Sequence, residues 1–521
     1  MKVVTGKQMQ ELDRLAAEHY GVPTAQLMER AGEQLFAALA SRFAPLAGKR
    51  VLIVAGKGHN GGDGLVLARL LRQQQTTVDI YLAAERTELK GLEREHLTRL
   101  EQAGRTVHDR TQWNMAQLRE AARASDVIVD ALLGTGVNAP VEGPLAELIE
   151  VINDSGVPVL AVDLPSGINA DTGRVMGTAV RAQVTVTFAL PKLGLLLHPG
   201  AEHAGHLIVG DIGIPQEAIG QLAIATEQIT TATLGRALSP RSPQQHKGDF
   251  GHLLVIAGSA GKTGAAALCA LGGLRGGAGL VTIAVPRSLN SILEGLVMEA
   301  MTAPVPETVD QTFAEAAVPG VVGLLDGKRA VALGPGLSLH PETQAFVRAL
   351  LPQLSCPFVI DADGLNALAG HEALVAASRA PVVLTPHPGE MARLLGCTVA
   401  QVEQDRPAAA RDAAKRYNAW VVLKGAGSLL AAPDGRLWIN TTGNPGMATG
   451  GTGDVLTGLL GGLLAQSVPL PDAAAAAVYL HGLAGDLAAE QMGETGLIAS
   501  DLLVHLPAAL RHARALRDAS T

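Results

Sequence analysis

The sequence predicts an α/β protein built as two three-layer αβα domains, and three observations lead to this fold class. The chain has 521 residues, more than a single hydrophobic core usually organises. Short, continuous apolar runs alternate with helix-compatible segments, as in a parallel sheet covered by helices on both faces. The 60 glycines and only 3% aromatic residues suit many tight loops between strands and helices.

The first half begins with two expected helices, residues 7–20 and 24–43. Leu27, Ala31, Leu35 and Leu39 repeat every four residues in the second, so one face of it should pack on a sheet. Strands are then expected at 50–55, 78–82, 126–130, 158–163, 184–189 and 206–209. The loop GKGHNGGDG follows the first of these and precedes a helix through Leu71, ALLGTGVNAP follows the third, and LPSGINADTG follows the fourth.

The regular alternation lapses between residues 214 and 245, where turn formers and prolines gather. This places the domain boundary near residue 220, giving domains 1–219 and 220–521. The second series of strands is expected at 252–257, 279–285, 330–333, 358–361, 382–385 and 420–424. Strand-like runs at 429–432 and 437–439, a helix-compatible run at 455–465 and a helical tail from Ala473 complete it.

Composition excludes several classes of protein. The net charge of −8 offers no general footprint for nucleic acid. Cys269, Cys356 and Cys397 match no zinc or disulfide spacing, which indicates a reduced, cytoplasmic compartment. The N-terminus lacks the apolar core of a signal peptide, and runs such as 455–465 are too short to span a bilayer, so no membrane partner is expected.

The stretch 440–460, NTTGNPGMATGGTGDVLTGLL, has the layout of an anion site. Glycines let the backbone approach a ligand, and the free N–H groups of the following helix face it. Asp454 is expected at the mouth of that helix, beside any bound phosphate. A carboxylate there is a candidate general base, and the alternative is that it only caps the helix.

Polar residues also follow the strands of the first half. Gly56, Gly58 and Gly61 fit the dinucleotide pattern G-x-G-x-x-G, a weak match by itself. Because ligands bind beyond the carboxyl ends of parallel strands, Asn60, Asp130, Asp163 and Ser166 are expected in one crevice. Their hard oxygen atoms suit an alkali or alkaline-earth cation, and the alternative for each acid is a helix cap.

Five motifs in order make residues 1–215 resemble the YjeF N-terminal domain of the NAD(P)H-hydrate epimerase family: LMERAG, GKGHNGGDG, VDALLGTG, VDLPSGINADTG and ALPKLGLL. The resemblance implies a Rossmann-like domain in which Asn60, Asp130 and Ser166 hold a potassium ion and Asp163 handles the proton. The family usually has Asn where this chain has His59. The residues implied to contact the hydrated nucleotide are His59, Asn60, Gly61, Gly62, Asp63, Gly134, Thr135, Gly136, Val137, Asn138, Ala139, Pro140 and Asp163.

In the second half, AGSAGKTGAA is not a Walker A motif, because Ile256 stands where the pattern requires Gly. GPGL, DADGLNAL, TPHPGE and KGAGS each follow a strand and together predict a cleft along the carboxyl edge of the sheet. Lys424 could bind phosphate as a point charge or be a solvated loop residue, and His387 could be a ligand contact or a turn residue.

Residues 225–515 resemble the ribokinase-like ADP/ATP-dependent NAD(P)H-hydrate dehydratases, most specifically through TPHPGEMARL and NPGMATGGTGDVLTG. The resemblance implies that Asp454 is the base that activates the hydroxyl of the hydrate for phosphorylation, with Mg²⁺ near Glu390 and ADP as the nucleotide. The hydrate would contact Ala265, Gly336, His387 and Asp454. The nucleotide would contact Lys424, Gly425, Ala426, Gly427, Ser428 and Gly453.

Together the resemblances imply a bifunctional repair enzyme with small-molecule substrates, and we expect a homo-oligomer. One alternative is a vitamin-type kinase, although such kinases more often have Asn where this chain has His387. A second is a non-catalytic nucleotide-binding or scaffolding role for the first domain, against which the set of Asn60, Asp130, Asp163 and Ser166 argues. A third is an NAD-dependent dehydrogenase using Glu85, which leaves the second half unexplained.

Overall fold

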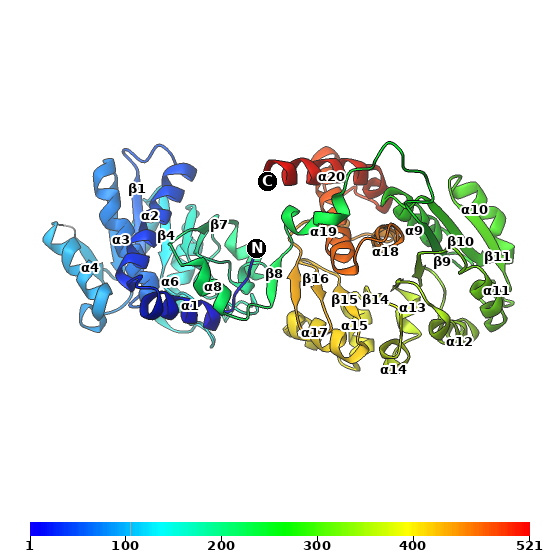
Figure 1. The fold of residues 1–521 in the computed structure, drawn as a ribbon. Coiled ribbons are helices and arrows are strands. Elements are labelled where there is room, and N and C mark those ends of the chain that lie inside the picture. The colour runs from blue at the N-terminus through cyan, green and yellow to red at the C-terminus, as the bar shows by residue number, and fades with distance from the viewer. Residues whose placement is uncertain (105, 521) are drawn as a thin grey trace. The chain divides into compact units, whose positions relative to one another are not determined.

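The computed structural model describes residues 1–104 and 106–520, and the chain forms two compact units, Met1–Ile224 and Ala225–Thr521 (Figure 1). Both are α/β, so the predicted fold class is confirmed. Among the described residues, no helix has both the length and the apolar character needed to cross a bilayer.

Unit 1 is organised by a seven-stranded parallel sheet in the order β3-β2-β1-β4-β5-β6-β7. The chain leaves β1 toward one edge of the sheet and later leaves β4 toward the other, so their loops diverge and leave a crevice between them. The strands are β1 Arg50–Ala55, β2 Thr77–Leu82, β3 Val107–Asp109, β4 Val127–Ala131, β5 Val159–Val162, β6 Val184–Phe188 and β7 His206–Gly210.

Helices cover both faces of this sheet. Side chains of β1 alternate between two buried clusters: Val51 and Ile53 pack with residues of α1 to α4, and Leu52 and Val54 pack with residues of α5 and α6. This alternation gives the three-layer αβα arrangement. The helices are α1 Gly6–His19, α2 Thr24–Arg42, α3 His59–Leu70, α4 Gly91–Gln102, α5 Met115–Arg123, α6 Pro144–Asn153, α7 Gly200–Ala204 and α8 Gln216–Gln221.

Unit 2 has a ten-stranded sheet in the order β11-β10-β9-β12-β13-β14-β15-β16-β17-β8. Its strands are parallel except that β16 runs antiparallel to both β15 and β17. The strands are β8 Thr226–Gln228, β9 His252–Ile256, β10 Leu280–Pro286, β11 Met301–Val305, β12 Ala330–Leu333, β13 Phe358–Ile360, β14 Val382–Leu384, β15 Trp420–Leu423, β16 Leu429–Ala431 and β17 Leu437–Ile439.

The helices of unit 2 lie on both sides of the sheet. Leu253 and Val255 of β9 pack into one buried cluster with α9, α18, α19 and α20, whereas α17 packs on β15 and β16 (Figure 1). The helices are α9 Thr263–Arg275, α10 Asn290–Leu296, α11 Val318–Gly323, α12 Pro341–Leu350, α13 Asp363–Asn366, α14 Glu372–Ala376, α15 Pro388–Leu395, α16 Val399–Gln404, α17 Arg406–Tyr417, α18 Thr452–Ala465, α19 Leu470–Met492 and α20 Ala499–Ser520.

Three strands escaped the sequence prediction, and each lacks a continuous apolar run. Strands β3 and β8 have only three residues each, reading VHD and TEQ, and β11 contains Pro304 at the outer edge of its sheet. Proline is tolerated there because an edge strand leaves part of its N–H groups unpaired. Two helices also begin earlier than expected, inside their glycine-rich motifs, at His59 and Thr452.

Helices α9 and α18 approach so closely that glycine is required where they cross. A Cβ atom on Gly458 would lie 1.9 Å from the carbonyl oxygen of Cys269. We therefore expect Gly458→Ala to lower the free energy of unfolding by about 2 kcal/mol or more, through overpacking against backbone. Gly264→Ala is the matched control, because its Cβ meets nothing within 4 Å on α9. Urea unfolding would check both, and equal stability of the two variants would contradict the packing argument.

Candidate active sites

The first candidate site lies where the loops after β1 and β4 diverge. Helix α3 begins at His59 with Gly58 as its N-cap, so Asn60, Gly61 and Gly62 form its first turn rather than the end of a loop. Gly61 is needed there, because a Cβ would lie 2.0 Å from the carbonyl oxygen of Gly56. The free N–H groups of this turn can bind an anionic ligand.

The structure brings together the three residues of the expected cation site. Asp130 is fully buried, with one carboxylate oxygen 2.6 Å from Ser166 Oγ and the other accepting from the Ser166 N–H at 2.8 Å. Asn60 Nδ2 donates to the carbonyl oxygen of Leu133 at 3.0 Å. Its Oδ1 is buried and has no hydrogen-bond partner among the described residues. Burial raises the pKa of Asp130 to about 6.

These donors fit a potassium ion. They are a carboxylate, a hydroxyl and an amide oxygen, the hard ligands that alkali cations accept. The oxygen of Asn60 that has no partner among the described residues is the observation that most specifically indicates a bound cation. A buried polar atom without a partner is costly unless a ligand satisfies it.

Asp163 sits at the end of β5 in a strained conformation, with φ of 62°. Such outliers in non-glycine residues tend to occur at functional sites. Its carboxylate contacts the ammonium of Lys192, whose side chain is only 1% exposed, and accepts from Thr187 Oγ1 at 3.0 Å. Lys192 also donates to Thr187 Oγ1 at 3.0 Å. The sequence interpretation quoted Lys192 only within ALPKLGLL and gave it no role.

Two further carboxylates share this region without such a partner. Burial, followed by the charges of Asp163 and Asp13, raises the pKa of Asp63 well above its usual range. Asp13, on α1, has its pKa raised to about 6 by burial, which outweighs the charge of Lys192. No sequence pattern singled out Asp13, because it is one polar residue on an otherwise ordinary helix.

The remaining expected contacts lie around the same crevice. Gly134 approaches Asn60, and Asn169 holds the loop 134–140 by donating to the carbonyl oxygen of Val137 at 3.0 Å. His59 Nδ1 is 2.5 Å from Glu93 Oε1, and its side chain is 74% exposed. Its ring therefore points to Glu93, and the backbone of the turn remains available to a ligand.

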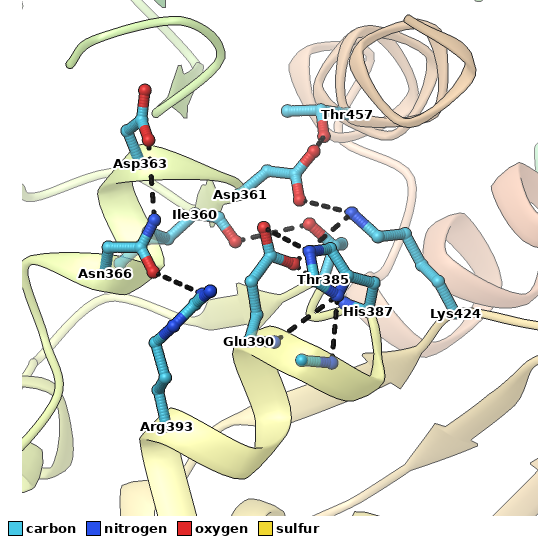
Figure 2. Close-up of polar contacts among 11 residues, drawn as sticks. Ile360, Asp361, Asp363, Asn366, Thr385, His387, Glu390, Arg393, Lys424 and Thr457 are labelled. Carbon is cyan, nitrogen blue, oxygen red and sulfur yellow. Dashed lines mark hydrogen bonds and ion pairs between the residues drawn. The ribbon is translucent and has the colours of Figure 1, made fainter. Parts of the chain in front are cut away.

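The second candidate site lies at the carboxyl edge of the sheet in unit 2. Figure 2 shows the carboxylate of Asp361 between Lys424 and Thr457. Its Oδ1 is 2.6 Å from Lys424 Nζ, and its Oδ2 accepts from Thr457 Oγ1 at 2.7 Å. Lys424 Nζ is also 3.8 Å from Glu390 Oε2. The sequence interpretation included Asp361 only within DADGLNAL and gave it no individual role, although the strand-end rule that found Asp130 and Asp163 applies equally to it.

Asp454 is the third residue of α18 rather than its N-cap, which is Gly451 with φ of 94°. The alternative that Asp454 merely caps the helix is therefore wrong. Burial, followed by the charge of Asp361, raises the pKa of Asp454 to about 7. A carboxylate with this pKa is poised to exchange a proton near neutral pH.

His387 caps α15, as Figure 2 shows. Its Nδ1 accepts from the N–H of Gly389 at 2.9 Å, while Glu390 Oε2 accepts from the N–H of His387 at 2.8 Å. Burial and the nearby Lys424 lower the pKa of His387, which keeps the accepting nitrogen unprotonated. Burial raises the pKa of Glu390, and this effect outweighs the opposing effect of the charge of Lys424.

The other expected residues fall into two groups. A Cβ on Gly336 would lie 3.1 Å from the Cβ of Ala265, and one on Gly453 would lie 3.3 Å from Lys424 Nζ. The loop 424–428 is tight, with φ of 141° at Gly425 and 65° at Gly427. The structure thus pairs Ala265 with Gly336, and Gly453 with Lys424.

Helix α19 holds the glycine-rich loop that precedes α18. Asp486 accepts from the N–H of Gly443 at 2.9 Å and from Asn444 Nδ2 at 3.0 Å. His481 Nε2 lies 2.8 Å from the carbonyl oxygen of Thr452. Burial lowers the pKa of His481 to about 4, so the neutral ring donates this bond.

Comparisons with known proteins were made for the whole chain. Residues 24–194 match the family described as YjeF-related protein N-terminus, and residues 253–508 match the family described as NAD(P)H-hydrate dehydratase. The chain is 43% identical over 514 residues to a protein of Moorella thermoacetica named bifunctional NAD(P)H-hydrate repair enzyme Nnr, covering 98% of this chain and 97% of that protein. A protein of Thermofilum pendens with the same name is 42% identical, covering 99% and 97%.

Among solved structures, unit 2 is similar to the ADP/ATP-dependent NAD(P)H-hydrate dehydratase of Bacillus subtilis co-crystallised with ATP and Mg²⁺. The identity is 32% and the TM-score is 0.49, over 56% of this chain and 100% of that chain.

The raised pKa of Asp454 makes a prediction about stability. Because the pKa of about 7 in the folded protein lies above the ordinary aspartate pKa of 3.8, the folded protein loses stability as the pH rises between these values. Asp454→Asn removes this loss, so its melting temperature should exceed that of the wild type by more at about pH 8 than at about pH 5. Asp326→Asn, on the surface, should show no such trend. Thermal unfolding would measure these melting temperatures. If the difference between Asp454→Asn and the wild type does not grow with pH, the raised pKa of Asp454 is contradicted.

Proposed function

The chain belongs to the family of bifunctional NAD(P)H-hydrate repair enzymes, and on that basis we propose which of its residues carry out each of the two reactions. Residues 1–219 hold the epimerase and residues 220–521 the dehydratase. The enzyme interconverts the R and S hydrates of NAD(P)H and converts the S hydrate back to NAD(P)H. The observation that carries the assignment is one buried carboxylate cluster at the strand ends of each unit.

For the epimerase we propose reversible loss of the C6 hydroxyl. Asp63 donates a proton to this oxygen, the ring nitrogen supplies electrons, and the C6–O bond breaks to release water. Water then adds to the opposite face of the ring and gives a proton to Asp163, and proton exchange with solvent restores the starting states of Asp63 and Asp163. The support is the contrast in environments: Asp163 contacts the ammonium of Lys192 and accepts from Thr187, while burial beside Asp163 raises the pKa of Asp63.

Substrate binding in unit 1 would use the first turn of α3 and the loop 134–140. The N–H groups of His59, Asn60 and Gly61, which precede the first hydrogen bond of the helix from Gly62 to Gly58, suit the diphosphate of the hydrate. Asn60, Asp130 and Ser166 would hold the potassium ion, which supplies a fixed positive charge beside that diphosphate.

For the dehydratase, Asp454 takes the proton of the C6 hydroxyl as its oxygen attacks the terminal phosphorus of ADP. AMP leaves, and the hydrate now carries a phosphate ester, a better leaving group than hydroxide. Cleavage of the C6–O bond releases phosphate, and loss of a C5 proton restores the dihydronicotinamide ring. The pKa of Asp454 near 7 supports its role as base.

The ligands of unit 2 follow from the same geometry. The nucleotide would lie along Lys424 to Ser428 and Gly453, and the hydrate along Ala265, Gly336, His387 and Asp454. A magnesium ion beside Glu390 would neutralise charge on the transferring phosphoryl group. We propose a cytoplasmic location, where NAD(P)H and ADP are found, and a homo-oligomer, which light scattering would test.

Separate sites predict separable defects in the intact protein. With mixed R and S hydrate, ADP and Mg²⁺, the wild type should restore the absorbance of the reduced nicotinamide ring completely. Asp454→Ala should abolish recovery, because no base remains for phosphorylation. Asp163→Ala should stop fast recovery once the S hydrate is consumed, leaving only the slow uncatalysed supply from the R hydrate. No recovery by the wild type with ADP or ATP would contradict the dehydratase assignment.

Lys192→Met tests the role given to the buried lysine. The variant keeps the length of the side chain but removes the positive charge that contacts Asp163, so epimerisation should slow by about 100-fold. Dehydration of pure S hydrate should be unaffected. Lys7→Met, an exposed lysine of α1, is the matched control. The rate of epimerisation is read from the second phase of absorbance recovery, in which the R hydrate is converted. A wild-type rate in Lys192→Met would argue against the role given to Lys192.

A further inference from the structure

Lys424 is held at both ends by charged residues. Its ammonium is 2.6 Å from Asp361 Oδ1, and its backbone carbonyl accepts from the guanidinium of Arg406 at 3.3 Å. Its own N–H donates to the carbonyl oxygen of Pro386 at 2.9 Å. A lysine whose only task is to attract phosphate as a point charge needs no such fixation, because its stem is flexible.

Asp361 is itself fixed. Its side chain is only 1% exposed, and both carboxylate oxygens have partners: Lys424 on one and Thr457 Oγ1, at 2.7 Å, on the other. Its backbone passes so close to Gly334 that a Cβ there would lie 1.9 Å from the carbonyl oxygen of Asp361. The next residue, Ala362, has φ of 49°. Backbone strain of this kind persists only where the surroundings enforce it.

The pair lies on the floor of the candidate site. A Cβ on Gly453 would lie 3.3 Å from Lys424 Nζ and 3.7 Å from Asp361 Oδ2. Gly453 immediately precedes Asp454, and Thr457 is one turn further along the same helix. A buried ion pair adds little to stability compared with apolar residues of similar size. Its retention at this position therefore points to the reaction rather than to the fold.

We propose that Asp361 is a positioning residue for the dehydratase reaction, acting through a chain of hydrogen bonds from Thr457 to Asp361 to Lys424 (Figure 2). The chain holds the ammonium of Lys424 beside Gly453 and ties it to the helix that carries Asp454. A chain of hydrogen bonds thus connects the positive charge that meets the phosphoryl group to the helix that carries the base. The inference rests on the function proposed above for this site.

Glu390 makes this positioning necessary. Its Oε2 is only 3.8 Å from Lys424 Nζ, so the ammonium has a second carboxylate within reach. Without Asp361, Lys424 keeps a partner in Glu390 and its charge stays compensated, but its position changes. Loss of Asp361 is therefore expected to act on the rate of the chemical step more than on folding, since small misplacements in a site cost about 100-fold in rate.

The test measures kcat and KM for ADP with the S hydrate in the full-length protein. Asp361→Asn keeps the size of the side chain and removes its charge, and we expect kcat to fall by about 100-fold with a much smaller change in KM. Thr457→Val should lower kcat in the same direction, and Thr457→Ser, which keeps the hydroxyl, should lose less. Wild-type kcat in Asp361→Asn, or equal losses in both Thr457 variants, would overturn the proposal.

A double-variant cycle separates positioning from an independent role. If Asp361 acts through Lys424, adding Asp361→Asn to Lys424→Met should cause no further loss of kcat. If the loss of kcat in the double variant equals the product of the losses in the two single variants, the proposal is overturned.

A crystal structure of Asp361→Asn gives a readout that needs no activity: Lys424 Nζ is expected nearer to Glu390, and an unmoved Lys424 would again overturn the inference. An inactive wild type whose Lys424 moves in the variant would instead count against the proposed function alone.

Discussion

At the candidate site of each unit a lysine lies among several carboxylates, and the behaviour of both sites depends on which carboxylate the lysine contacts most closely. In unit 1, Lys192 contacts Asp163, and in unit 2, Lys424 contacts Asp361. Asp63 and Asp454 lie outside this closest contact, and burial raises the pKa of each. Each site therefore has one carboxylate in contact with the lysine and another whose pKa burial raises.

The two units put this asymmetry to different use. In the proposed epimerase, the reaction needs a proton donor and a proton acceptor at once, and the paired and unpaired carboxylates supply both. In the proposed dehydratase, the unpaired Asp454 acts alone as base, while the paired Asp361 fixes the cation that meets the phosphoryl group. The difference follows from the chemistry: returning water to a ring needs two proton transfers, whereas phosphoryl transfer needs one base and positive charge.

Sequence alone predicted most of the fold because most strands are continuous apolar runs. RVLIVA and AVAL became strands β1 and β12 at the predicted bounds, and the fold class is confirmed. The short strand TEQ has no such apolar run. It is a strand because it pairs with β17, and this contact is not visible in the local sequence. The starts of α3 and α18 were placed too late because glycine was taken as loop, although glycines there allow close backbone contact instead.

The candidate sites were predictable as far as each polar residue followed a strand or stood in a motif. Asn60, Asp130 and Ser166 do lie together, as their strand-end positions indicated. What local patterns could not show were pairings between distant segments: Lys192 is 29 residues from Asp163, and Lys424 is 63 residues from Asp361. Only the tertiary fold makes these contacts, and they decide which acid lies against the lysine.

His387 shows how one residue can serve both the fold and the site. Vitamin-type kinases, the alternative considered from the sequence, more often have Asn at this position, and the amide oxygen of Asn is a common helix cap. Here Nδ1 of His387 accepts from the N–H of Gly389 and so does the same work for α15. The ring has a second nitrogen, Nε2, 3.4 Å from Glu390 Oε1, which an asparagine lacks. Because the lowered pKa keeps the ring neutral, the cap and this second nitrogen are available together. The histidine thus preserves the cap while adding a second polar group beside Glu390 at the candidate site.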